Sequence, residues 1–300
     1  MKKIFYTLVF TMMFVACNKV PLSNRSQLSL VPKSQLMASS FSSYDQVLSE
    51  SKLSNNTQQV QMIRNVGNKI KVAVEKYLAD NNKSDIIEDF EWEFNLIQED
   101  VVNAWCMPGG KVAFYTGILP VCQDEEGIAV VMGHEVAHAV ARHGGERMSQ
   151  ALIQQLGGVA LSVALREQPE QTQALAMAAY TGGSTVLGVL PFSRLHESEA
   201  DRLGLTFMAM AGYNPEAAPE FWKRMQAKSA GSPPEFLSTH PSGDTRIKDL
   251  NKWMPEANKY YQKASKESNS PIPQVDSQSD NSSQTEPKKK KKVIQLKIDN

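Results

Sequence analysis

The 300-residue sequence predicts an α+β fold that is mainly helical, with a small β-sheet. Two observations support this prediction. Apolar residues recur at three- and four-residue steps through most of the chain, which is the period of an amphipathic helix. Residues 91–115 instead break into short runs rich in Val, Phe and Trp, as strands do. A hydrophobic content of 41% suffices for a core, and we expect a single domain at residues 44–263.

The N-terminal residues are typical of an export signal. Two lysines precede an apolar run at residues 4–15, which is too short to cross a bilayer comfortably as a mature helix. Small residues lead into Cys17, so residues 1–16 are predicted as a lipoprotein signal peptide and Cys17 as the acylated first residue of the mature chain. The alternative is an ordinary signal peptide with an incidental cysteine. Residues 17–43 are polar and irregular, and they predict a tether along the domain surface.

The first helix is predicted at about residues 44–78, where apolar residues share one face and two asparagines follow as a stop. In residues 91–115, a Pro-Gly-Gly sequence at 108–110 separates the last two strand-like runs. These two runs therefore predict a hairpin or a bulged sheet edge.

A long helix is predicted from Asp124 to Arg142, because Asp124 is a good N-cap and two glutamates follow it in the first turn. Gly144 and Gly145 are predicted to end this helix. Residues 146–190 are rich in Ala, Gly, Leu and Gln, and they predict two helices broken around 168–170. Their surfaces either pack tightly or contact a membrane, but neither stretch is free of polar residues for long enough to predict a transmembrane helix.

Two further helices are predicted at about residues 193–211 and 215–228, followed by a loop and a short helix. Residues 264–300 are Ser, Gln, Pro, Asp and Lys with almost no apolar content, and they predict a disordered tail. We interpret the run Lys288–Lys292 as part of a solvated tail, with attraction to anionic lipid as the alternative. The formal net charge is zero, so the charge balance gives no argument for a nucleic-acid partner.

His134, Glu135 and His138 form the pattern HExxH within the long helix. Positions four apart lie roughly 40° apart around a helix, so the two imidazoles project side by side and can bind one zinc ion. Glu135 lies alongside, where it can take a proton from a metal-bound water and later deliver it to a leaving amine. The pentapeptide alone leaves a chance match on a buried helix open, because it fixes only three positions.

The surroundings of the motif favour a metal. The helix is apolar around the motif, and burying its three polar groups costs free energy unless a partner satisfies them. A catalytic zinc usually has three protein ligands. Glu197 on a later helix is the predicted third ligand, and Asp201 is predicted to accept a hydrogen bond from a ligand histidine. Glu199 is the weaker ligand candidate, and a solvated helix face is the alternative interpretation of the two carboxylates.

Three further features of the sequence are a pair of histidines, an extended segment and two cysteines. His143 would be rotated by roughly 140° from His138 on a continuous helix, so it is predicted to be structural, and His196 is predicted to turn away from the site. An extended segment at Asn103, Ala104, Trp105 and Cys106 is predicted to pair with a substrate backbone as an added strand. Whether Cys106 and Cys122 form a disulfide stays open.

These motifs resemble the BepA-like zinc metallopeptidases, relatives of HtpX and of the CAAX prenyl proteases, which are gluzincins. The resemblance rests on "NAWCMPGGKVAFYTGIL", "DEEGIAVVMGHEVAHAVARHGGERMS", "SRLHESEADRLG" and "STHP". It implies a gluzincin domain in which His134, His138 and Glu197 bind zinc and Glu135 is the general base. It also implies that Asp201 lies just behind the ligands.

The resemblance also puts the loop of His240 near the cleft. Three roles for His240 are open. It donates a hydrogen bond to the oxyanion, or it occupies the open zinc position and so holds the enzyme latent, or it only caps the loop. Many proteins of the family continue into a tetratricopeptide-repeat domain. This chain shows no repeat of about 34 residues, so repeat-mediated partner docking is not expected.

The sequence therefore predicts a metalloendopeptidase with one zinc ion per chain. Its expected substrates are unfolded or misassembled envelope proteins, since the resemblance implies a quality-control role. A lipid on Cys17 is expected to hold it in the periplasm, at the outer rather than the inner membrane, because Asn18 follows the cysteine. The alternative is a non-enzymatic, zinc-containing envelope chaperone or scaffold, although a structural site usually has four closed protein ligands and needs no base.

Overall fold

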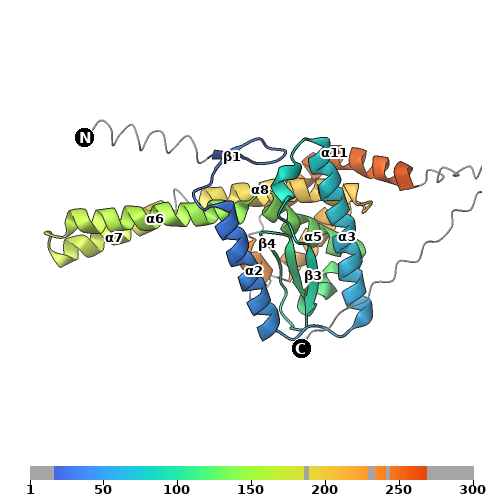
Figure 1. Ribbon diagram of the computed structural model, residues 1–300, viewed down its shortest axis with the longest axis horizontal. Helices are drawn as coiled ribbons and strands as arrows, with labels where there is room; N and C mark the ends of the chain where they lie inside the picture. The colour runs from blue at the N-terminus through green and yellow to red at the C-terminus, as the bar shows by residue number, and fades with distance from the viewer. Residues whose placement is uncertain (1–16, 186–188, 229–233, 241–243, 269–300) are drawn as a thin grey trace, which may run out of the picture. The chain divides into compact units, whose positions relative to one another are not determined.

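The computed structural model describes residues 17–185, 189–228, 234–240 and 244–268 (Figure 1). The predicted signal peptide and the run Lys288–Lys292 lie outside these residues. In chain order the elements, with η for 3-10 helices, are β1 (Cys17–Lys19), β2 (Ser26–Leu28), α2 (Lys33–Glu50), α3 (Thr57–Asp80), η1 (Ser84–Ile87), β3 (Glu93–Ile97), β4 (Ala104–Met107), β5 (Lys111–Tyr115), η2 (Thr116–Ile118), α4 (Leu119–Cys122), α5 (Glu125–Val140), α6 (His143–Leu165), α7 (Glu170–Ser184), α8 (Leu190–Met210), α9 (Ala217–Ala227), α10 (Glu235–Thr239) and α11 (Asp244–Ser268). The architecture confirms the predicted α+β class.

The main sheet has three strands in the order β3-β5-β4. β4 and β5 form the predicted antiparallel hairpin, and β3 lies parallel to β5. Gly109 and Gly110 turn the hairpin with φ values of 92° and 79°, which only glycine adopts without strain. β4 is therefore an edge strand of this sheet.

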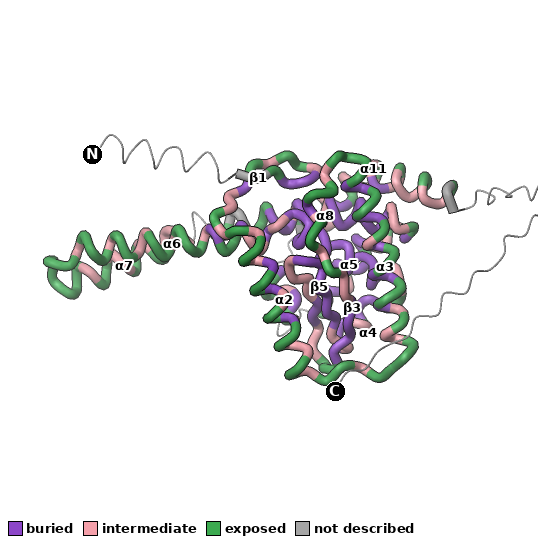
Figure 2. Tube along the Cα trace, viewed as in Figure 1, coloured by how far each residue is buried: buried purple, intermediate pink, exposed green. Residues whose placement is uncertain are grey.

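α5 lies in the centre of the core, packed against α8 and α3 (Figure 2). Every residue of α5 from Gly127 to Val140 is buried. A Cβ atom at Gly133 would lie 2.7 Å from the carbonyl oxygen of Gly204 in α8, and a Cβ atom at Gly204 would lie 2.7 Å from the backbone nitrogen of His134. The two helix backbones are thus in contact, and this contact brings the motif on α5 face to face with the carboxylates on α8.

The predicted tether at residues 17–43 is wrong. Residues 17–28 contain the β1–β2 hairpin, in which Val20 is fully buried, and α2 begins at Lys33. The prediction took the polar residues of this segment to be exposed, whereas their side chains form hydrogen bonds within the protein. Gln27, for example, donates to the carbonyl oxygen of Ala141 at 2.9 Å.

Two predicted helix boundaries also differ. The helix expected at residues 44–78 is two helices, because the side chain of Asn56 caps a new helix by accepting from the backbone nitrogen of Gln59. At the C-terminal end, α11 continues through Ser268, so the predicted start of the tail at residue 264 is too early.

The two helices predicted within residues 146–190 are α6 and α7, with a break at residues 166–169. They lie side by side as a hairpin that extends away from the sheet (Figure 1). The predicted helix end at Gly144 and Gly145 is wrong, because both glycines lie within α6. The break comes earlier, at Arg142, whose φ of 57° is left-handed.

Candidate metal centre

The predicted site residues are His134, Glu135, His138, Glu197, Asp201 and His240. The structure brings all of them together from α5, α8 and the C-terminal end of α10, and all are buried. One donor atom from each of His134, His138, Glu197 and His240 lies within 4.8 Å of the other three.

The four donor groups converge at short distances. Nε2 of His138 lies 3.1 Å from Nε2 of His134. The Glu197 carboxylate lies 3.3 Å from Nε2 of His134 and 3.4 Å from Nε2 of His138. Nδ1 of His240 lies 3.2 Å from Nε2 of His134 and 3.1 Å from Oε2 of Glu197. His240 therefore belongs to the donor cluster rather than only to its loop.

This donor set fits a divalent metal ion. Imidazole nitrogens and one carboxylate are ligands that zinc takes in proteins. Burial lowers the pKa of His134, but hydrogen bonds to Asp201 and Glu197 outweigh burial and raise that pKa to about 9. The cluster thus attracts positive charge, which a metal ion held by the three histidines and Glu197 would supply.

Asp201 lies behind the donor cluster. Its Oδ1 lies 2.9 Å from Nδ1 of His134, so the opposite ring nitrogen faces the donor cluster. Arg246 of α11 donates to Asp201 and to Glu197, each at 2.6 Å. The guanidinium also lies 3.8 Å from the ring centroid of Trp222. Sequence reasoning missed Arg246, which lies six residues after His240.

The carboxylate of Glu135 lies beside the donor cluster. Its Oε1 is buried and has no hydrogen-bond partner among the described residues, and it lies 3.4 Å from Nε2 of His240. Burial raises the pKa of the Glu135 carboxyl. A raised pKa makes a carboxylate a better acceptor for a proton than an ordinary exposed one.

The prediction that His143 faces away from the site is wrong. Nδ1 of His143 lies 2.9 Å from Nδ1 of His138, and Nε2 of His143 lies 3.1 Å from Oε2 of Glu199. The prediction assumed a continuous helix, whereas the left-handed Arg142 ends α5 and α6 starts again at His143. This break turns the imidazole back toward His138.

Glu199 connects the histidine pair to the β1–β2 hairpin. Arg25 donates to Glu199 at 2.9 Å and to Glu146 at 2.8 Å. His196 is fully buried, its Nε2 lies 2.8 Å from Glu146, and its ring stacks on that of His143. Sequence reasoning missed Arg25 and Glu146. The available signal was a single arginine in an otherwise uncharged stretch, "PLSNRSQLSL".

The predicted substrate segment is found at the sheet edge. Ala104, Trp105 and Cys106 lie in β4, and Asn103 precedes it. The side chain of Asn103 donates to Glu235 at 3.0 Å, which ties α10 to this end of the edge. Cys106 does not form a disulfide, since both it and Cys122 are free thiols.

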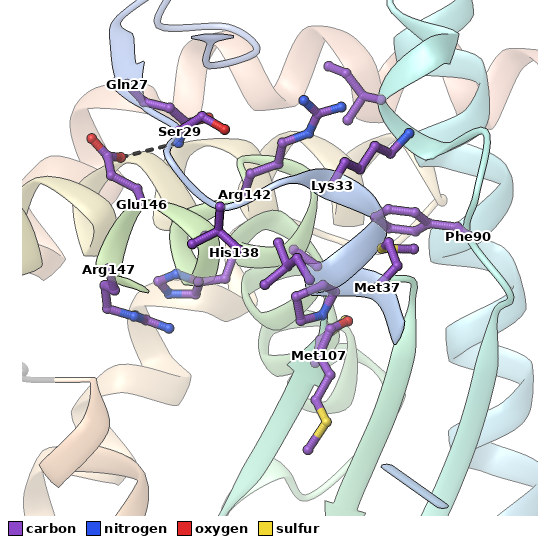
Figure 3. Close-up of a pocket in the computed structure, with 18 of the residues that line it drawn as sticks. Gln27, Ser29, Lys33, Met37, Phe90, Met107, His138, Arg142, Glu146 and Arg147 are labelled. Atoms are coloured by element: carbon purple, nitrogen blue, oxygen red, sulfur yellow. Dashed lines mark hydrogen bonds between the residues drawn. The ribbon is translucent and has the colours of Figure 1, made fainter. Parts of the chain in front are cut away.

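A cavity of about 240 Å³ lies beside His138 (Figure 3). Met37, Phe90 and Met107 are among the apolar residues that line it, and Arg147 brings a positive charge. Its position beside a donor histidine makes it a candidate subsite for a substrate side chain.

The sequence of the chain also matches a known protein family. The model of peptidase family M48 matches residues 67–254, a range that contains every residue of the donor cluster. The chain belongs to peptidase family M48. Membership in M48 confirms the resemblance noted in the sequence and the prediction of a metallopeptidase.

Several curated M48 relatives align with the chain. Mitochondrial metalloendopeptidase OMA1 of Schizosaccharomyces pombe is 39% identical over 175 residues, which are 57% of this chain and 49% of that protein. Human mitochondrial metalloendopeptidase OMA1 is 30% identical over 243 residues, 79% of this chain and 46% of that protein. The beta-barrel assembly-enhancing protease of Escherichia coli is 32% identical over 169 residues, 53% of this chain and 33% of that protein. The chain thus spans half or less of the length of these M48 proteins.

The predicted location in the periplasm at the outer membrane is wrong by this comparison. M48 relatives from two yeasts, Arabidopsis thaliana and Bos taurus are named mitochondrial metalloendopeptidases. The prediction depended on the residue that follows Cys17, a sorting rule taken from one group of bacteria.

Proposed function

We propose that the chain is a zinc-dependent endopeptidase that cleaves unfolded or misassembled proteins. The observation that carries this proposal is the convergence of His134, His138 and Glu197 beside the Glu135 carboxylate, whose Oε1 has no hydrogen-bond partner among the described residues. Two histidines and one glutamate are a recurrent ligand set of catalytic zinc. A structural site would have no use for the neighbouring carboxylate.

The residues around the donors have distinct roles in peptide hydrolysis. Zinc at this site would act as a Lewis acid toward the scissile carbonyl and would acidify the attacking water. Glu135 takes the proton from that water and delivers it to the leaving amine. Asp201 fixes the ring of His134, and Arg246 holds both Asp201 and Glu197 in place.

His240 is the proposed latch of the enzyme. It contacts Glu197 at 3.1 Å and Glu135 at 3.4 Å, so it occupies the space between the ligands and the base. A substrate carbonyl and a water must bind in this same space. We therefore expect His240 to move away from Glu135 and Glu197 before cleavage, and the enzyme to be latent until then.

Substrate and membrane contacts complete the proposal. A substrate in extended conformation would pair with the edge strand β4, a mode in which backbone hydrogen bonds supply affinity. Unfolded segments are extended and expose their backbone, so they suit such an edge. A lipid on Cys17 would hold the enzyme at a membrane.

A non-enzymatic zinc chaperone or scaffold is the second candidate. The observation in its favour is that four protein donors, including His240, close the site, as in structural zinc centres. In this case His240 would be a permanent ligand and not a latch.

One experiment separates the two candidates. Cleavage of unfolded casein is measured for the wild type, Glu135→Gln and His240→Ala, together with the zinc content of each. The endopeptidase proposal expects zinc in all three proteins, cleavage by the wild type, none by Glu135→Gln and more by His240→Ala. No cleavage by any of the three proteins, together with zinc lost from His240→Ala, would favour the scaffold.

A further inference from the structure

The α6–α7 hairpin exposes an apolar surface to solvent. Large hydrophobic side chains between 38% and 61% exposed lie along α6, namely Met148, Leu152, Ile153, Leu156, Val159 and Val163. The buried residues of α6 are His143, Glu146 and Ser149, all near its N-terminal end. Figure 2 shows the rest of the hairpin as exposed or intermediate. Isolated exposed hydrophobic residues are ordinary, but a continuous face of this extent indicates a binding surface.

The hairpin also lacks charge along its length. No charged residue occurs from Met148 to Leu165, nor from Gln171 to Ser193, and the charges between these stretches are at the tip, at Arg166, Glu167 and Glu170. α6 has 23 residues, which at about 1.5 Å per residue gives a length of roughly 34 Å. The hydrocarbon core of a bilayer is about 30 Å thick. Within the described residues, α6 is the one helix long and apolar enough to cross a membrane by length and composition.

Two hydrogen bonds join polar groups of the two helices of the hairpin. Tyr180 donates to the carbonyl oxygen of Gln154 at 2.9 Å, and the Gln154 side chain donates to Ser184 at 2.7 Å. Gly157 lies against the Tyr180 hydroxyl, where a Cβ atom would clash. Small residues and interhelical hydrogen bonds inside, with aliphatic side chains outside, are typical of helix pairs in lipid.

We propose that the α6–α7 hairpin inserts into a lipid bilayer. The aliphatic face of α6 carries neither the aromatic nor the arginine side chains that anchor protein interfaces, so lipid fits it better than a protein partner or a second copy of this chain. The insertion is separate from any lipid on Cys17. It places a membrane-embedded segment between the metal donors His138 and Glu197.

Fluorescence quenching tests the insertion at one position. The four native tryptophans lie outside the hairpin, so the full chain receives an added tryptophan as Leu156→Trp. The matched control is Val72→Trp, at a residue 61% exposed on α3. Both variants are added to phosphatidylcholine vesicles with or without bromine on the acyl chains. Quenching at a single position reports insertion of the hairpin even when the N-terminus also binds the vesicle.

Insertion predicts that the added emission of Leu156→Trp shifts to shorter wavelength with vesicles and is quenched by the bromines, while that of Val72→Trp is not. Equal emission from the two variants in both kinds of vesicle would overturn the proposal. So would a concentration-dependent blue shift of Leu156→Trp without lipid, which would show that a second copy covers the face. Val159→Trp, on the same face, is the second probe if Leu156→Trp fails to fold by circular dichroism.

Discussion

Nδ1 of His143 lies 2.9 Å from Nδ1 of His138, so one of the two nitrogens carries the proton between them. Nε2 of His143 faces the Glu199 carboxylate, which only accepts, and is therefore protonated. Burial lowers the pKa of His143 to about 4, so its ring is neutral at pH 7 and its Nδ1 accepts. His138 then donates from Nδ1 and keeps the lone pair of Nε2 for a metal.

Replacing this acceptor should weaken metal binding. His143→Phe removes the group that fixes the tautomer of His138, and we expect zinc affinity to fall roughly 10- to 100-fold. Competition with a chelator at pH 7 measures the affinity. Val140→Ala, a fully buried change on the same helix, should lower stability without altering affinity. Wild-type affinity in His143→Phe would contradict the assignment.

Removing Arg246 should destabilise the metal-free protein more than the zinc-bound protein. Arg246→Met leaves the buried carboxylates of Asp201 and Glu197 without their shared counter-charge, at a cost of about 3–5 kcal/mol. Zinc restores positive charge, so the loss should be smaller in its presence. Urea unfolding with chelator and with zinc measures both values. Arg202→Met, which breaks a half-exposed pair with Glu256, should lose at most about 1 kcal/mol. If Arg246→Met loses the same stability with and without zinc, then zinc and Arg246 do not neutralise the same carboxylates.

The Arg25–Glu199 pair predicts acid sensitivity. Burial raises the pKa of Glu199, but hydrogen bonds from His143, Arg25 and Ser23 outweigh burial and lower it to about 2. Because the folded pKa lies below the unfolded value of 4.5, the carboxylate stabilises the fold above pH 4.5, and this stability is lost as the pH falls toward 2.

Arg25→Met should shrink this acid-dependent loss, because it lets the pKa of Glu199 rise toward its ordinary value. The free energy of unfolding, measured from about pH 5 down to about pH 2.5, gives the slope. Lys33→Met is the control, since its ion pair with Asp89 is largely exposed and contributes little. If the free energy of unfolding of Arg25→Met depends on pH as that of the wild type does, Arg25 does not lower the pKa of Glu199.

The contact between α5 and α8 should not tolerate a methyl group. Gly133→Ala forces a Cβ atom against the carbonyl oxygen of Gly204, and we expect a loss of roughly 1–3 kcal/mol together with lower zinc content. Gly182→Ala in α7 meets no atom within 4 Å and should instead stabilise by up to about 1 kcal/mol. Thermal unfolding and zinc analysis of both variants check this, and wild-type stability in Gly133→Ala would refute the close approach.

Local spacing explains what could be predicted from the sequence. His134 and His138 share a helix face because four residues make about one turn, and Glu197 and Asp201 do so for the same reason. The partners of Arg25 and Arg246 could not be predicted, because each arginine reaches its carboxylates only through tertiary packing. The role of His143 was missed because one left-handed residue, Arg142, resets the direction of the helix.

The wide separation of the donors along the chain has a consequence for the newly made protein. His134 and His240 are 106 positions apart, and the α6–α7 hairpin lies between the α5 and α8 donors. A chain still being synthesised or partly unfolded therefore holds only the local histidine pair, and metal binds the native state selectively. Under the proposed function, the protease becomes competent only after its own folding is finished, so immature copies do not digest one another.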